Sequence, residues 1–96
     1  MIASFHDLAK VELNEAAQYY ERESPGLGVA FVAEVERCTV AILQHPEASP
    51  FVTRAIRRRL LRRFPYGLLY RVSAEHVRIL AVMNLKRRPA YWVDRA

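Results

Sequence analysis

Three short apolar runs, separated by turn-forming residues, dominate the second half of the chain. They occupy residues 60–61, 68–72 and 77–83, and arginines lie between and within them. Residues 64–67 and 73–76 join consecutive runs and contain Pro, Gly or short polar residues, which favour turns. Short branched or aromatic runs in this arrangement are typical of consecutive antiparallel strands. We therefore predict a three-stranded antiparallel meander, against which the rest of the chain must pack.

The first half of the chain begins with a short strand and a helix. Residues 2–5 form a predicted edge strand. Ala9, Leu13 and Ala16 then recur on one helical face, which predicts a helix over residues 8–22 with Asp7 as its N-cap. Three acidic side chains of this helix are expected to face water: Glu12, Glu15 and Glu23.

A second helix is predicted after a break at residues 25–28. Its apolar stripe has helical spacing and consists of Phe31, Val35, Cys38 and Ile42. It should end near His45, because Pro46 disfavours helical backbone at the residue before it. Residues 46–53 then form a loop. The predicted fold class is α+β: an N-terminal short strand and a helical hairpin packed on a C-terminal antiparallel sheet.

The predicted strands are apolar on both faces. Along residues 77–83, Ile79, Ala81 and Met83 share one parity, and Leu80 and Val82 share the other. A strand that is apolar on both sides is covered on both sides. The helices can cover one face, so the other requires the chain's own tail or a second chain.

Length and composition indicate one globular domain over residues 1–96. The hydrophobic fraction of 52% argues against disorder, and no apolar run approaches the ~18 residues that a membrane span needs. The N-terminal ten residues contain an acidic side chain and no long apolar stretch, so a secretion signal is not expected. With the single cysteine, Cys38, these features suggest a cytoplasmic protein.

Charge is divided unevenly between the two halves. Residues 1–50 contain three basic and eight acidic residues, whereas residues 51–96 contain twelve basic and two acidic ones. Thirteen of the fifteen basic residues are arginine, whose planar guanidinium suits carboxylates and phosphates. This asymmetry suggests an oppositely charged partner for the basic half, either nucleic acid or an acidic protein segment. A solvated sheet face is the simpler alternative.

The sequence contains few signs of catalysis. His6, His45 and His76 stand apart without metal-ligand spacing, and no cofactor motif is present, so neither a metal nor a cofactor is expected. Metal-free RNA cleavage needs arginine to stabilise phosphate charge and a residue that moves a proton. The weak candidates for these roles are Arg71, Arg87, Arg88 and Tyr91. The structural alternative, which we favour, is that Tyr91 and Trp92 anchor the tail on the sheet.

The chain resembles the RelE/ParE toxin superfamily along nearly its whole length. The helical half carries the resemblance in Glu12-Leu13, Ala16, Tyr19-Tyr20-Glu21, Gly26-Leu27-Gly28, Phe31, Glu34-Val35-Glu36, Ile42 and Pro46. The sheet and tail carry it in Arg63-Phe64-Pro65-Tyr66, Tyr70-Arg71-Val72, Ile79-Leu80-Ala81-Val82 and Arg87-Arg88-Pro89-Ala90-Tyr91-Trp92. The resemblance implies a toxin of a bacterial type II toxin–antitoxin pair, a class often labelled plasmid stabilisation proteins.

The superfamily has two activities, and the resemblance favours one of them here. RelE-type members cleave mRNA on the ribosome, and ParE-type members inhibit DNA gyrase. In nucleases an arginine follows the tyrosine that opens the middle strand, where this chain has Gly67 after Tyr66. A second nuclease arginine corresponds to Leu85, and a histidine of another branch corresponds to Asn84. The ParE-like, non-enzymatic interpretation is therefore preferred over an mRNA endonuclease, and a nucleic-acid-binding module or an inactivated toxin is a third alternative.

The resemblance also implies an antitoxin partner. An acidic, ParD-like antitoxin is expected to lay a flexible segment across the helices and the basic sheet. Its carboxylates can pair with the exposed guanidinium groups. The candidate antitoxin- or target-binding residues are Arg57, Arg59, Arg62, Arg63, Arg71, Arg87, Arg88 and Trp92.

Overall fold

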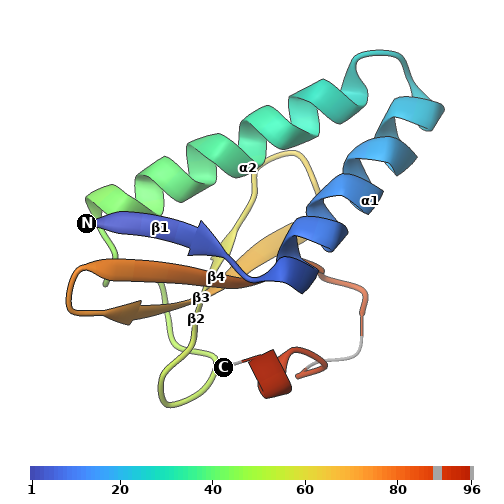
Figure 1. Ribbon diagram of the computed structural model, residues 1–96. Helices are drawn as coiled ribbons and strands as arrows, with labels where there is room; N and C mark the ends of the chain where they lie inside the picture. Colours follow the sequence, from blue (N-terminus) through green and yellow to red (C-terminus); the bar gives the residue numbers. More distant parts are fainter. Residues whose placement is uncertain (88–89, 96) are drawn as a thin grey trace.

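The computed structural model describes residues 1–87 and 90–95. Its elements follow one another as β1 (Ile2–Phe5), α1 (Asp7–Glu23), α2 (Leu27–Gln44), β2 (Arg57–Leu60), β3 (Tyr66–Ser73), β4 (His76–Asn84) and a one-turn 3-10 helix, η1 (Val93–Arg95). The two helices lie on one side of the sheet, and the C-terminal segment lies on the other (Figure 1). The α+β class, the helical hairpin and the order of elements agree with the prediction.

The sheet contains the predicted meander and the predicted edge strand. Its strand order is β1-β4-β3-β2, and the pairs β2–β3 and β3–β4 are antiparallel. β1 is parallel to β4, which makes the sheet mixed. The first strand of the meander begins at Arg57, before the apolar run at residues 60–61. The apolar run did not mark this start, because the first three residues of the strand are arginines, which pair with β3.

A register shift breaks the expected alternation in β4. Leu69 pairs with Ala81 and Tyr70 pairs with Ile79, so Leu80 is an extra residue in its strand. Leu80 and Ala81 therefore both face the side of the sheet away from the helices, whereas Ile79 and Val82 face the helices. The predicted grouping of Ile79 with Ala81 was wrong, because a bulge interrupts the two-residue period.

The helical hairpin is tighter than its turn signals indicate. α2 already begins at Leu27, so Gly28 lies inside the helix rather than in the break. A β-carbon at Gly28 would clash with the backbone carbonyl oxygen of Ala17, so only glycine permits this approach of α1. At the start of α1 the N-cap is His6, whose Nδ1 accepts a hydrogen bond from the backbone N–H of Leu8 at 3.1 Å. The prediction of Asp7 as N-cap was therefore wrong.

Each face of the sheet has its own apolar cluster. The larger cluster lies between the sheet and the helices and includes Phe31, Leu68 and Ile79. Cys38 belongs to it as a small buried side chain, as predicted, and burial raises the pKa of its thiol to about 11. The smaller cluster covers the opposite face and consists of Ile56, Leu69, Leu80, Ala81, Met83 and Trp92. The chain's own tail and the loop before β2 therefore cover the second face.

Candidate functional site

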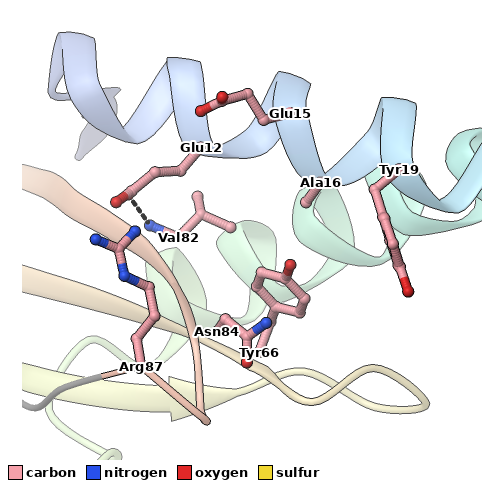
Figure 2. A pocket seen from close by; sticks show the side chains of 8 residues that line it. All are labelled: Glu12, Glu15, Ala16, Tyr19, Tyr66, Val82, Asn84 and Arg87. Carbon is pink, nitrogen blue, oxygen red and sulfur yellow. Dashed lines mark hydrogen bonds between the residues drawn. The ribbon is translucent and has the colours of Figure 1, made fainter.

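A cleft of about 270 Å³ opens between α1 and the end of the sheet where β3 begins and β4 ends. Figure 2 shows its lining side chains: those of Glu12, Ala16 and Tyr19 extend from α1 toward the sheet, and that of Glu15 lies alongside the helix. The lining residues are Glu12, Glu15, Ala16, Tyr19, Tyr66, Val82, Asn84 and Arg87. A neighbouring hollow continues this cleft past Tyr19, Tyr66 and Asn84 to Lys86.

Helical and strand periodicities explain why these residues meet. Residues three and four positions apart share one face of a helix, so Glu12, Ala16 and Tyr19 line the same wall. On the opposite wall Asn84 lies two residues beyond Val82 in β4, and two residues apart in a strand means the same face. Tyr66 pairs with Asn84 in the sheet register, which places the two side chains side by side.

Glu12 holds three parts of the chain together at one end of the cleft. Its carboxylate accepts a hydrogen bond from the backbone N–H of Val82 at 3.0 Å. The same carboxylate accepts hydrogen bonds from both terminal nitrogens of the Arg95 guanidinium, at 2.9 and 3.1 Å. Arg95 also donates to the carbonyl oxygen of Leu80 at 3.0 Å. The expectation that Glu12 faces water was wrong, because this residue carries the ion pair between α1 and the tail; Glu15 and Glu23 are exposed as expected.

Tyr91 lies beneath two guanidinium groups and beside Glu12. The guanidinium carbon of Arg87 is 4.1 Å from the centre of the Tyr91 ring, and that of Arg95 is 5.1 Å away. The phenolic oxygen is buried and, within residues 1–87 and 90–95, has no hydrogen-bond partner. Burial, followed by the neighbouring Glu12 carboxylate, raises the pKa of Tyr91 far above its usual value. This hydroxyl is therefore a poor proton carrier at neutral pH.

Asn84 and Tyr66 present polar groups at the centre of the cleft. The Asn84 side-chain oxygen accepts a hydrogen bond from the backbone N–H of Lys86 at 2.9 Å. That bond fixes the amide, whose NH₂ group carries two N–H donors, so that one can serve the Tyr66 hydroxyl and the other a ligand. Burial raises the pKa of the Tyr66 hydroxyl, and a hydrogen bond from Asn84 partly offsets this effect.

The candidate arginines are distributed over several places. Arg71 lines a different hollow, with Arg54, Arg57 and Phe51, so the structure does not bring it to Arg87 and Tyr91. Arg57 is half-buried, donates to the carbonyl oxygens of Glu47 and Ser49, and stacks 3.8 Å from the Phe51 ring centre. These contacts already occupy Arg57.

The remaining candidates differ in their availability. Arg59 is half-buried, whereas Arg62, Arg63, Arg71 and Arg87 are exposed. Arg88 lies outside the described residues. Trp92 is only 4% exposed and belongs to the apolar cluster of the second face. The structural alternative for Trp92 is thus confirmed, and a partner could reach this side chain only by displacing the tail.

Sequence reasoning missed Glu12 and Arg95 as a pair. The signal for Glu12 was present, because it lies three residues after Ala9 and four before Ala16, on the apolar stripe itself. Charged residues on such a stripe are buried only when they have a partner. The partner could not be identified from spacing, since Arg95 is distant in sequence and reaches Glu12 through the fold of the tail.

Across residues 1–87 and 90–95, no three His, Cys, Asp or Glu side chains are grouped so that they could hold a metal ion. The helices within those residues include none with the length and apolar character of a membrane span.

Comparison with known proteins identifies the class. The family model for the ParE toxin of the type II toxin–antitoxin system parDE matches residues 3–89, and the chain belongs to that family. Among solved structures, the chain is similar to one described as the chromosomal ParDE toxin–antitoxin system from P. aeruginosa, with a TM-score of 0.75 and 20% identity. That similarity covers 90% of this chain and 97% of the other. The search of curated protein sequences found no match to this chain.

Proposed function

We propose that this chain is a toxin that inhibits DNA gyrase and that a cognate antitoxin neutralises it. Membership of the ParE toxin family supports the toxin class and an antitoxin partner. One observation on the structure favours the gyrase branch over RNA cleavage: the candidate catalytic groups do not form one site. Arg71 lies in another hollow than Arg87, and the Tyr91 hydroxyl is buried.

Inhibition of gyrase is tested with purified components. Added to purified gyrase and relaxed plasmid, the chain should abolish ATP-dependent supercoiling, and prior mixing with its antitoxin should restore it. Relaxation by a type I topoisomerase on the same plasmid serves as the control and should be unaffected. Intact supercoiling, together with mRNA cleavage in the ribosomal A site that disappears in Tyr91→Phe, would establish the nuclease alternative instead.

The proposed antitoxin surface combines an apolar groove with exposed arginines. The groove lies between α1 and α2, has a volume of about 510 Å³, and is lined by Ala17, Gln18, Glu21, Gly28, Val29, Val32, Ala33 and Glu36. Val29 is 72% exposed, and an apolar helix surface of this kind is typical of a protein interface. The second sheet face, for which the sequence left open the chain's own tail or a second chain, is covered by the tail. We therefore assign the apolar anchors of the antitoxin to the groove. Its acidic side chains are assigned to the exposed guanidinium groups of Arg62, Arg63 and Arg71.

A charge placed in the groove should disrupt the complex. Val29→Asp should weaken binding of the protein encoded by the neighbouring reading frame more than tenfold, because a carboxylate would be buried without a partner. Val40→Asp is the matched control, since Val40 is 53% exposed on the same helix but outside the groove.

The arginines should contribute less than the groove. Raising the salt concentration should weaken the complex only moderately, because apolar anchors carry most of the affinity. Calorimetric titration measures both effects. Equal affinities for the two aspartate variants would remove the groove from the interface. A steep loss of binding with salt would instead indicate that the basic half is a nucleic-acid surface.

A further inference from the structure

The cleft beside α1 has walls of opposite charge. The wall from α1 contributes the carboxylates of Glu12 and Glu15, whereas the opposite wall contributes Asn84, Lys86 and Arg87. The Glu12 oxygens are occupied by Arg95 and the Val82 N–H. Glu15 is exposed and, among the described residues, makes no ion pair. A ligand in the cleft therefore meets one free carboxylate on one side and cationic or amide donors on the other.

Aromatic rings provide flat surfaces between these walls. Tyr66 is held by neighbouring rings, with its centroid 5.0 Å from Phe31 and 6.1 Å from Tyr20. Tyr19 packs against Tyr20 at 5.3 Å and remains 50% exposed toward the solvent. Rings fixed in this way favour stacking of a planar ligand, because little side-chain entropy is lost on binding.

Few ligands satisfy both walls. A partner's arginine or lysine would suit Glu15 but would be repelled by Lys86 and Arg87. A partner's carboxylate would suit Lys86 and Arg87 but would be repelled by Glu15. A planar ligand with a donor-rich edge and a separate anionic group satisfies both requirements.

We infer that the cleft binds a guanine nucleotide. Guanine carries two adjacent donors, N1–H and the N2 amino group, which match the two oxygens of the Glu15 carboxylate. Its O6 and N7 acceptors and its phosphate match the donors of Asn84, Lys86 and Arg87. Adenine has one donor and one acceptor on the same edge, so Glu15 would repel its N1. The selectivity for guanine over adenine therefore comes from Glu15.

The size of the cleft suits one base. Its volume of about 270 Å³ is just below the range of roughly 300–1,000 Å³ that sites for drug-sized ligands occupy, so it has room for a single base. The base can come from a free nucleotide or from an unstacked residue of single-stranded nucleic acid. Both present the same groups to Glu15 and Tyr66. This inference is independent of the effect on gyrase.

Calorimetric titration of the full chain with guanosine 5′-monophosphate and adenosine 5′-monophosphate tests the inference. Guanosine monophosphate should bind about tenfold more tightly than adenosine monophosphate. Glu15→Gln should weaken guanosine monophosphate binding about tenfold and should not weaken the adenine nucleotide, because the amide presents one donor and one acceptor, which fit the adenine edge but not the two donors of guanine. Tyr19→Leu should weaken both nucleotides by a similar factor, since stacking does not distinguish bases.

A matched variant separates local contacts from overall charge. Glu75→Gln removes the same charge from the exposed β3–β4 turn, at the far end of the hairpin from the cleft, and should bind like the unmodified chain. Saturable binding that discriminates guanine and depends on Glu15 supports the inference. No saturable binding, equal affinity for both nucleotides, or no effect of Glu15→Gln would overturn it.

The source of the base is distinguished by a single-stranded RNA tetranucleotide and its DNA counterpart, each containing one guanine. If the cleft serves nucleic acid, a tetranucleotide should bind at least tenfold more tightly than the mononucleotide and weaken steeply with salt. If it serves free nucleotides, the tetranucleotides should bind no more tightly than guanosine monophosphate. Either result is compatible with the guanine site and assigns its ligand.

Discussion

Replacing Glu12 with glutamine should lower the free energy of unfolding by about 3 kcal/mol, because it leaves the buried Arg95 guanidinium without a counter-charge. The side chains of Glu12 and Arg95 are only 12% and 11% exposed, so water cannot compensate for the loss. Glutamine retains the shape and can still accept from the Val82 N–H. The expected loss therefore isolates the charge, and urea unfolding monitored by circular dichroism measures it.

An exposed pair on the same helix provides the control. Lys10 and Asp7 lie 4.0 Å apart with side chains that are 62% and 95% exposed. Lys10→Gln should change the free energy of unfolding by about 0.5 kcal/mol or less, since exposed ion pairs contribute little. The variant with both Glu12→Gln and Arg95→Met should lose less than the sum of the single losses. Additive losses, or a loss below about 1 kcal/mol for Glu12→Gln, would show that the pair does not join α1 to the tail.

The fold could be predicted from the sequence because its signals are local. The helical stripe from Phe31 to Ile42 and the runs at residues 68–72 and 77–83 each have one dominant period. The sequence also indicated that the second sheet face needs a cover. It left open whether the tail or a partner supplies that cover, because hydrophobic spacing records that a residue is buried and not what buries it.

The site was harder to predict because its residues come from distant parts of the chain. Glu12 and Arg95 meet only after the tail has folded back, and no spacing in the sequence records that meeting. The bulge at Leu80 likewise depends on the partner strand, so parity along β4 alone gave the wrong faces. The resemblance led to Tyr66, Asn84 and Tyr91 one at a time. Only the three-dimensional arrangement shows that Tyr66 and Asn84 share a cleft with Glu15.

The tail has a structural role that limits which residues a partner can use. Trp92 is sequestered on the second sheet face with Ile56 and Met83, while Arg87 remains exposed at the cleft. A change at Trp92 that abolishes toxicity would therefore report a loss of folding before a loss of partner contact. The free energy of unfolding of each tail variant must therefore be measured together with its activity. The variant Trp92→Ala sets the scale of this effect.

Trp92→Ala should lower the free energy of unfolding by about 4 kcal/mol, because it removes the largest side chain from the second apolar cluster and leaves a cavity against Leu80 and Met83. Trp92 is the only tryptophan, so its emission reports on this cluster alone: it should be blue-shifted in the native chain and shift red on unfolding. Val93→Ala is the neighbouring control, since Val93 is 47% exposed and its loss should cost about 0.5 kcal/mol or less. The alanine variant at Trp92 should also bind a hydrophobic dye, which the parent should not, because the sheet face beneath it becomes accessible. Unchanged stability with red-shifted native emission would instead place Trp92 in water, free to contact a partner.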